Sequence, residues 1–396
     1  MAVDAGVLTD FLADFLADPA VATLFAALPG ARAVGGCVRD ALARRPTADI
    51  DLATPMPPDK VASALQAAGI RVVPTGLEHG TLTAVVGGRG FEVTTLRRDV
   101  VTDGRRAEVA WTDDWQVDAA RRDFTINAMS MAPDGTLYDY FGGQADLRAG
   151  RVRFVGDAAV RVAEDHLRVL RFFRFQARYG IGAPDPSAVA AVSEGAASIA
   201  RLSVERVWSE MKRILAAPDP AAAVALMDQL GVLAFVVAEG ADPAALARLC
   251  AAGAPPDPIL RLAALLTGDP AALAARLRLS HAEADRLRAL RAPPLAPDVA
   301  DAALRRALAV DAADTLIDRT WLAGQTGPAW DGLRMRLATT PRPVFPLEGR
   351  DVLAVGLLPG PQIGALLRAV EAWWMAGGCV ADAASCRGEL ARLARD

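Results

Sequence analysis

The sequence predicts an α+β amino-terminal region, built on one small mixed or antiparallel sheet with helices, followed by an all-α remainder. Two observations lead to this fold class. Short runs with strand character recur, separated by helical or polar pieces, up to about Gly156. After Asp157 these runs stop, and alanine and leucine recur at helical spacing between breaks such as "GAPDPS" and "GAPPDP". At 396 residues the chain is also too long for one ordinary core.

The elements are expected in the following order. A helix spans about Val7 to Leu28, "ARAVGG" is a strand that runs into a glycine turn, and a second helix spans Val38 to Arg44. The polar stretch from 97 to 120 is expected to be a long mobile loop. Further strands are expected at "DIDLAT", "IRVVPT", "TLTAVVGG", "FEVTTL", "TLYDY" and "RVRFV".

The composition points to a helix-rich protein of the cytoplasm. Apolar residues make up 53% of the chain but aromatic residues only 6%, because alanine carries much of the total. The first stretch contains acids and has no apolar run of about 18 residues, so neither a signal peptide nor a membrane anchor is expected. Four cysteines without C-x-x-C spacing argue against a zinc knuckle or a disulfide framework. The net charge of −4 does not indicate a nucleic-acid partner, so local arginines would have to hold one.

A glycine turn and a pair of aspartates form the first chemical motif. Gly35 and Gly36 stand between a predicted strand and a predicted helix, where backbone N–H groups can approach phosphates closely. In an extended strand, Asp49 and Asp51 face the same side, while Ile50 points into the core. Two carboxylates on one face can share a hard cation such as Mg²⁺. An isolated D-x-D is more often a solvated turn, but the glycine turn ahead of it favours the metal site.

These residues resemble the head domain of a known enzyme family, the class II CCA-adding tRNA nucleotidyltransferases and bacterial poly(A) polymerases of the polymerase-β-type nucleotidyltransferase superfamily. The resemblance is sharp from about Ala31 to Tyr179 and general in the helical remainder. The matching motifs are GG-x-V-R-D, D-x-D, His79-Gly80-Thr81, "FEVTTLRRDVVTDGRRAEV", "RRDFTINAM", "YDYFGGQADL" and the stretch that begins "EDHLRVLRFFRF".

The resemblance implies a role for each matching residue. Asp49 and Asp51 would hold two Mg²⁺ ions that bridge to a nucleoside triphosphate. Gly36 and Arg39 would hold the nucleotide phosphates, and Arg122 would contact the triphosphate or ribose. Glu92 is either a third carboxylate of the site or an ordinary solvent-side acid, and the sequence does not decide between them. In "RRDFTINAM", Asp123 and Asn127 are expected to organise the local turn, and Arg121 to be a surface charge.

The stretch from Glu164 to Gly180 suggests how a base could be selected. If Asp165 starts a helical turn, Arg168 lies three residues on and shares its face, whereas Leu167, Leu170 and Phe173 form a separate apolar stripe. Cytosine and adenine each offer an amino donor beside an unprotonated ring nitrogen. A carboxylate only accepts and a guanidinium only donates, so this pair fits C and A but not U or G.

The resembling family uses its matching Asp and Arg in this way. It also places the next two arginines, here Arg171 and Arg174, near the nucleotide and its phosphates. From spacing alone, a helix with a solvated arginine face is the alternative.

The expected function is template-independent addition of CCA to the 3′ end of tRNA, with CTP and ATP as substrates and Mg²⁺ as the cofactor. A poly(A) polymerase, a partial enzyme that adds only C or only A, and a catalytically inactive RNA-binding protein are the alternatives. No arginine-rich G-R-R-F-R-type signature precedes "FEVTT", which favours CCA addition. Neither DNA nor a membrane is expected as a partner.

The resemblance also suggests a division of the chain. Residues 1–156 would form the nucleotidyltransferase head, 157–220 a helical neck with the nucleotide-selecting helix, 221–340 the body and 341–396 the tail. The helical part would grip tRNA by its phosphates and its shape. Residues 201–215 are a candidate contact helix, with a packing helix that has a charged outer face as the alternative.

Overall fold

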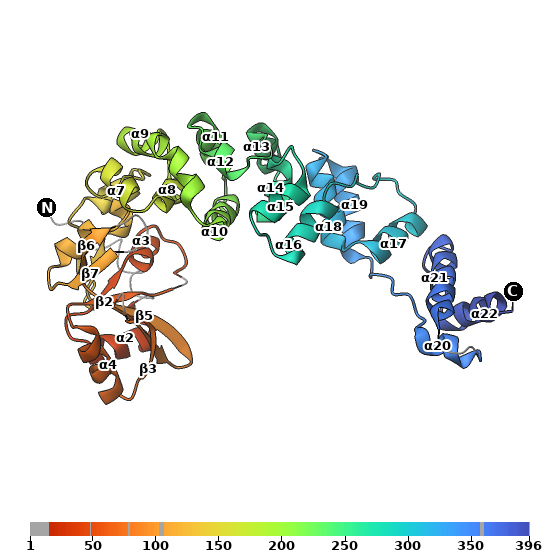
Figure 1. The fold of residues 1–396 in the computed structure, drawn as a ribbon, viewed down its shortest axis with the longest axis horizontal. Helices are drawn as coiled ribbons and strands as arrows, with labels where there is room; N and C mark the ends of the chain where they lie inside the picture. Colours follow the sequence, from red (N-terminus) through yellow and green to blue (C-terminus); the bar gives the residue numbers. More distant parts are fainter. Residues whose placement is uncertain (1–15, 48, 78–79, 103–106, 357–359, 396) are drawn as a thin grey trace. The chain divides into compact units, whose positions relative to one another are not determined.

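The computed structural model describes residues 16–47, 49–77, 80–102, 107–356 and 360–395 (Figure 1). The chain forms two compact units, Met1–Ala238 and Glu239–Asp396. The finer boundaries at 156, 220 and 340 stay predictions. The helix expected from 7 to 28 lies partly outside the described residues; within them, α2 (Pro19–Ala27) begins after Asp18, whose side chain accepts from the backbone N–H of Ala20 at 2.9 Å.

A seven-stranded mixed sheet forms the centre of the first unit, with the order β3-β4-β5-β2-β1-β8-β9. Neighbouring strands are antiparallel except for β2 and β5, which run parallel. This confirms the expected fold class. The strands are β1 (Arg32–Val34), β2 (Leu52–Thr54), β3 (Arg71–Gly76), β4 (Thr81–Val86), β5 (Arg89–Thr95), β8 (Ser130–Met131) and β9 (Leu137–Tyr138).

Helices pack on one face of β4 and β5, whose side chains alternate in burial. In β4, Leu82 and Ala84 are buried while their neighbours are half-buried, and in β5 the buried residues include Phe91 and Val93. They belong to one apolar cluster with Ile50, α2 and α4 (Pro58–Ala67). Ile50 therefore points into the core, as the D-x-D spacing predicts.

Two expectations about strands are wrong. Residues 97–120 are not one long loop, because β6 (Arg97–Thr102) pairs antiparallel with β7 (Ala107–Trp111) and α5 (Trp115–Ala120) follows. The run "RVRFV" forms no strand, although Val152 and Phe154 are buried. Phe154 makes only an isolated bridge with Phe124, since no neighbouring strand offers a ladder.

The helices α7 and α8 join the head to the helical remainder of the first unit. The buried side chains of α8 include Leu167, Leu170 and Phe173, which confirms the apolar stripe. Phe172 packs edge-on against Phe173 and stacks on Phe154, with ring centroids 5.2 and 6.3 Å apart. The remaining helices of this unit are α3 (Gly36–Leu42), α6 (Gly143–Arg148), α7 (Ala158–Glu164), α8 (Leu167–Tyr179), α9 (Pro186–Glu194), α10 (Val204–Leu215), α11 (Ala221–Gln229) and α12 (Leu233–Val236), with the 3₁₀ turns Thr125–Asn127 and Ala196–Arg201.

The second unit is helical throughout its described part, apart from one isolated bridge. Several of its helices start at an Asp-Pro pair, in which the aspartate caps backbone N–H groups and proline occupies the first turn, as at Asp242, Asp257 and Asp269. The breaks "GAPDPS" and "GAPPDP" are therefore helix starts, since α9 begins at Pro186 and α14 at Pro258. The helices are α13 (Pro243–Ala251), α14 (Pro258–Leu265), α15 (Pro270–Arg276), α16 (His281–Ala289), α17 (Asp301–Val310), α18 (Ala313–Leu322), α19 (Pro328–Thr339), α20 (Gly349–Ala354), α21 (Pro361–Ala376) and α22 (Ala383–Leu393).

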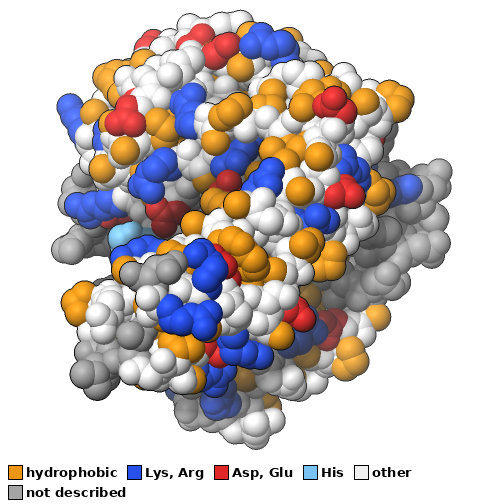
Figure 2. All heavy atoms as spheres, turned by 90° about the vertical axis from the view of Figure 1, so that its right-hand side faces the viewer, with side chains coloured by type: hydrophobic (Ala, Val, Ile, Leu, Met, Phe, Trp, Pro, Cys, Tyr) orange, Lys and Arg blue, Asp and Glu red, His pale blue; other side chains and the backbone are white. Residues whose placement is uncertain are grey.

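The surface carries charges of both signs. On the face drawn in Figure 2, basic side chains are scattered, with acidic and apolar ones between them. This agrees with the small net charge of −4. In the described part of the chain, none of the helices has the length and apolar character needed to cross a bilayer.

Candidate active site

A cavity of about 1020 Å³ in the first unit gathers the predicted site residues. It lies between the sheet of the head and the helices α3, α8 and α10. All of the predicted residues line it, although they come from distant segments of the sequence: Gly36, Arg39, Asp49, Asp51, Arg122, Asp165, Arg168, Arg171 and Arg174. Glu92, which the sequence left undecided, lines it as well.

The carboxylates Asp49, Asp51 and Glu92 make one wall of the cavity negative. Burial, together with the negative charges of Glu92 and Asp49, raises the pKa of Asp51 from 3.8 to about 6, although the positive charge of Arg122 opposes this. Within the described residues, no three His, Cys, Asp or Glu side chains converge closely enough to hold an ion by themselves. The wall therefore suits a hard cation that takes one or two carboxylates and completes its shell with phosphate oxygens, as Mg²⁺ does.

The glycine turn lies beside Asp51, because the N–H of Val34 donates to the carbonyl oxygen of Asp51 at 2.9 Å. Gly35 links β1 to α3 with φ 69°, a left-handed conformation that favours glycine. A Cβ atom at this position would lie 3.0 Å from Nη1 of Arg122. Glycine at position 35 therefore leaves room for the Arg122 guanidinium beside the start of α3.

Arg39 is buried in the floor of the cavity, with 9% of its surface exposed. Its Nε and Nη2 donate to the two carboxylate oxygens of Asp40 at 3.1 and 3.0 Å, and its Nη1 donates to Oδ1 of Asn127. The hydroxyl of Tyr179 also donates to Asp40. Arg39 is thus held in a fixed orientation by α3, by the "RRDFTINAM" segment and by the end of α8.

The arginines of "RRDFTINAM" share one buried acid. Asp118 on α5 is 3% exposed, accepts from Nη2 of Arg121 at 2.8 Å and from Nη2 of Arg122 at 3.2 Å. Burial alone would raise the pKa of Asp118, but these two guanidiniums lower it below its usual value. The expectation that Arg121 is a surface charge is wrong, because its side chain is only 18% exposed and lines the cavity.

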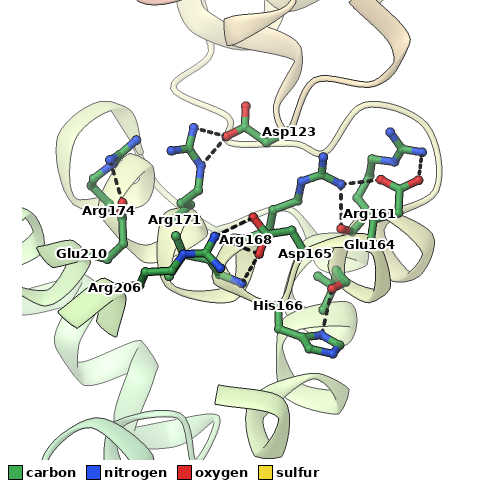
Figure 3. A network of polar contacts seen from close by, with 12 residues as sticks. Asp123, Arg161, Glu164, Asp165, His166, Arg168, Arg171, Arg174, Arg206 and Glu210 are labelled. Atoms are coloured by element: carbon green, nitrogen blue, oxygen red, sulfur yellow. Dashed lines mark hydrogen bonds and ion pairs between the residues drawn. The ribbon is translucent and has the colours of Figure 1, made fainter. Parts of the chain in front are cut away.

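Arg168 is anchored by contacts from two segments, α7 and the residue that ends α5; Figure 3 shows the contact with α7. Its Nη1 donates to Oε2 of Glu164 at 2.5 Å and to the carbonyl oxygen of Arg161 at 2.8 Å, and its Nη2 donates to the carbonyl oxygen of Arg121 at 3.1 Å. A guanidinium has five N–H donors. Contacts within the described part of the chain take three of them, so two remain for a ligand.

Asp165 is bound by a residue that the sequence motif does not contain. Its Oδ1 accepts from the backbone N–H of Leu167 at 3.1 Å, and Nη2 of Arg206 on α10 reaches Oδ1 and Oδ2 at 3.2 and 3.1 Å. Figure 3 shows that Asp165 and Arg168 do not bond to each other. A carboxylate offers about four acceptor positions. The three contacts leave one of them, on Oδ2.

The next two arginines of α8 are each held by a buried acid. Nε of Arg171 donates to Oδ2 of Asp123 at 2.7 Å, and Nη1 of Arg174 donates to Oε1 of Glu210 on α10 at 3.1 Å. Asp123 also accepts from the N–H of Phe124 and from Asn127, so it organises the turn as expected. Burial and the nearby positive charge of Arg171 lower the pKa of Arg174 to about 10, a value at which it stays protonated at neutral pH.

Four acids or bases of this network were missed in the sequence. Glu164 precedes Arg168 by four residues, which is the spacing of a helical ion pair, so that signal was present. Asp118 stands in the same relation to Arg122. Arg206 and Glu210 lie 41 and 36 residues from their partners, and no local spacing rule reports such pairs.

Two family models match the chain. The model of the Poly A polymerase head domain covers residues 31–153, which include the sheet, the D-x-D and "RRDFTINAM". The model described as a probable RNA and SrmB-binding site of polymerase A covers residues 183–242, which include α9 to α12.

Curated and solved relatives agree with these models. The chain is 37% identical over 367 residues to the mitochondrial CCA tRNA nucleotidyltransferase 1 of Mus musculus, a match that covers 88% of this chain and 83% of the relative. It is 46% identical over 207 residues to the Danio rerio protein of that name, across 52% of this chain and 48% of the relative. The crystal structure of the Bacillus stearothermophilus CCA-adding enzyme in complex with CTP matches with a TM-score of 0.71 and 28% identity, over 92% of this chain and 93% of that chain. The chain therefore belongs to the family of CCA tRNA nucleotidyltransferases.

Proposed function

We propose that this protein adds C, C and A to the 3′ end of tRNA from CTP and ATP, without a nucleic-acid template, and releases pyrophosphate. One observation carries the proposal: Asp49 and Asp51 line the same cavity as Asp165 and Arg168. One cavity thus holds both carboxylates for cations and a donor and acceptor pair for a base. The names of the mouse and zebrafish relatives support tRNA as the substrate, and the complex of the Bacillus enzyme with CTP supports CTP as a nucleotide substrate.

Asp49 and Asp51 are the proposed ligands of Mg²⁺. The raised pKa of Asp51 supports this role, since burial and the negative charges of Glu92 and Asp49 raise it more than the positive charge of Arg122 lowers it. Bound there, the metal would activate the 3′ hydroxyl of the RNA and stabilise the leaving pyrophosphate. Glu92 acts on Asp51 through its charge, and it is not part of the proposed ligand set.

The part of the cavity beside Asp51 and along α8 is proposed to hold the triphosphate. Gly36 offers backbone at the start of α3, and Arg122, Arg171 and Arg174 contribute positive charge around the cavity. Each of these guanidiniums is oriented by a carboxylate or a carbonyl, which lowers the entropy lost when it binds a ligand. Arg39, which is buried and also lines the cavity, is a further proposed contact to the nucleotide phosphates.

Asp165 and Arg168 are proposed to read the edge of the incoming base. The open acceptor position on Oδ2 of Asp165 suits the amino group of cytosine or adenine, and the two remaining N–H donors of Arg168 suit the ring nitrogen beside it. Uracil and guanine present a carbonyl and an N–H instead, so both contacts would be mismatched. A mismatch of this kind can cost about 10⁴-fold in selectivity in favourable sites.

Incorporation of labelled nucleotides tests this function. Purified protein is incubated with Mg²⁺ and tRNA that lacks its CCA end, with each nucleoside triphosphate alone and with CTP and ATP together. CTP alone should add two residues, ATP should then add one, and UTP and GTP should add none. A long A tail would indicate a poly(A) polymerase, and C or A addition alone a partial enzyme.

A matched variant separates catalysis from binding. Asp49→Ala combined with Asp51→Ala should still bind tRNA in a gel-shift experiment but incorporate no nucleotide. If wild-type protein also binds without incorporating, the protein is an inactive RNA binder and the proposal is wrong.

The cytoplasm is the proposed location, because all four cysteines are free.

A further inference from the structure

One face of the central sheet belongs to the cavity, and the register of the strands determines which side chains it carries. Leu52 of β2 pairs with Val93 of β5, which pairs with Leu82 of β4, and all three are buried in the core. Because side chains alternate between the two faces of a strand, their neighbours along each strand lie on the other face. The neighbours that line the cavity are Asp51, Glu92, Thr94 and Thr81.

These side chains have a fixed order across the sheet. The glycine turn lies on one side of Asp51, because β1 pairs with β2 on that side. Strand β5 lies on the other side of β2, and β4 lies beyond β5. Thr94 and Thr81 are directly opposite each other on these two strands. Asp51 therefore lies between the glycine turn, where the triphosphate is proposed to bind, and the two threonines.

The hydroxyls of Thr81 and Thr94 form a pair inside the cavity, with their oxygens 3.1 Å apart. A hydroxyl has one O–H donor and two acceptor positions. Whichever hydroxyl donates within the pair, the other keeps its own O–H, so the pair can still donate once and can also accept. Both side chains are β-branched, which restricts their rotamers and holds the two oxygens in place. The pair thus offers a donor and acceptors to one further hydroxyl group.

The geometry of nucleotidyl transfer assigns the end of the RNA primer to the side of the threonines. The attacking and leaving oxygens lie roughly in line across the transferred phosphorus. With the pyrophosphate leaving beside the glycine turn, the 3′ oxygen of the primer bonds to the α-phosphorus from the opposite side, over β5 and β4. The terminal ribose carries a 2′ hydroxyl on the adjacent carbon, and this group can both donate and accept.

We propose that the pair of Thr81 and Thr94 binds the 2′ hydroxyl of the primer's terminal ribose and so positions the neighbouring 3′ hydroxyl for attack. The inference rests on the proposed function, because it assumes that the triphosphate lies beside the glycine turn. The contact distinguishes an RNA end from a DNA end, since a 2′-deoxyribose leaves the remaining donor of the pair without a partner.

Two primers that differ by one oxygen atom test this contact. Both are tRNA without the CCA end, one ending in a ribose and the other in a 2′-deoxyribose, and addition of the first C is measured as kcat/KM for the primer. Wild-type protein should prefer the ribose end about tenfold, the size of one or two hydrogen bonds. The double variant Thr81→Val with Thr94→Val keeps the β-branched shape and a residue that favours strands. It should lose this preference, mainly by slower extension of the ribose-ended primer.

A second threonine pair on the same sheet face provides the control. The hydroxyl oxygens of Thr75 and Thr83 are 2.9 Å apart, and both residues belong to the described part of the chain but not to the cavity lining. Thr83→Val should therefore keep the wild-type preference for the ribose end. Discrimination between CTP and dCTP reports on the sugar of the incoming nucleotide, and it should be unchanged in the Thr81 and Thr94 double variant.

Three results would overturn the inference and leave the proposed function standing. Wild-type protein could extend both primers equally well, the double variant could keep the wild-type preference, or it could lose activity equally on both primers. A loss of discrimination against dCTP would assign the pair to the incoming nucleotide and would overturn the inference as well. Failure of the proposed function is distinct, since wild-type protein would then add neither C nor A to the ribose-ended primer.

Discussion

Replacing Asp51 with asparagine should stabilise the first unit in the absence of metal, while it abolishes nucleotide transfer. Asp51 sits among Asp49 and Glu92, and burial and these charges raise its pKa from 3.8 to about 6. Its ionised form therefore destabilises the folded state. The penalty is absent below the unfolded pKa of about 4, grows as the pH rises, and is complete above the folded pKa of about 6.

The magnitude follows from the pKa difference. About two pKa units correspond to about 3 kcal/mol. Asp51 is partly exposed, so solvent screening reduces this to about 1 to 2 kcal/mol at pH 7.5. The asparagine side chain of D51N is not ionised at any of these pH values, and the gain should shrink toward zero near pH 4.

Hydrogen exchange in EDTA measures the effect within the first unit alone, which matters because a chain with two compact units does not unfold in one step. The opening free energy of amides in β2 and β5 should rise in D51N at pH 7.5. The control is Asp59→Asn, since Asp59 is exposed in the first turn of α4, where its charge is favourable. In the Asp59→Asn variant, the opening free energy should fall by roughly a few tenths of a kcal/mol. A pH-independent gain in D51N, or no gain, would refute the electrostatic argument.

Three further predictions follow from the cavity. The affinity for Mg²⁺, measured by calorimetry, should fall about tenfold per pH unit below pH 6, because a proton on Asp51 competes with the metal; an affinity that does not change from pH 7 to pH 5 would contradict this ligand assignment. Glu164→Gln should reduce the preference for CTP over UTP about tenfold, since it weakens the charged contact that orients Arg168, and equal losses for all four nucleotides would point to a different role. Asp118→Ala should lower the opening free energy of amides in the first unit, measured by hydrogen exchange, by about 3 kcal/mol and raise the KM for nucleotides, because Arg122 loses its buried partner; unchanged exchange and KM would count against it.

Local patterns were enough to predict most of the sheet. The alternation in β4 and β5 matches the buried side chains, and the strand, glycine turn and helix at β1, Gly35 and α3 follow the expected order. The β6–β7 hairpin was missed because its polar composition outweighed the Asp103-Gly104 pair between two strand-like runs, which is a hairpin signal. "RVRFV" has the alternation of a strand and buries Val152 and Phe154, but strand formation also needs a neighbouring ladder, which no local pattern reports.

For the site too, the sequence identified residues but not the partners that hold them. The resemblance indicated which residues face the cavity, because the D-x-D, "RRDFTINAM" and the stretch at Asp165 each bring chemistry that one reaction needs. It did not indicate what holds them. Arg168 is anchored by α7 and by the end of α5, and Asp165 by α10, and these contacts depend on how helices pack. Sequence spacing reports partners one helical turn away and is silent about partners 41 residues away.

Nucleotide selection by Arg168→Ala tests whether a carboxylate and a guanidinium recognise the base. Initial rates with CTP, ATP, UTP and GTP are measured on tRNA primers, with Arg174→Ala as the matched loss of charge. Arg168→Ala should raise UTP and GTP incorporation relative to CTP and ATP, with little change in triphosphate affinity. Arg174→Ala should weaken all four nucleotides alike. Unchanged rejection of UTP and GTP by Arg168→Ala would contradict the claim.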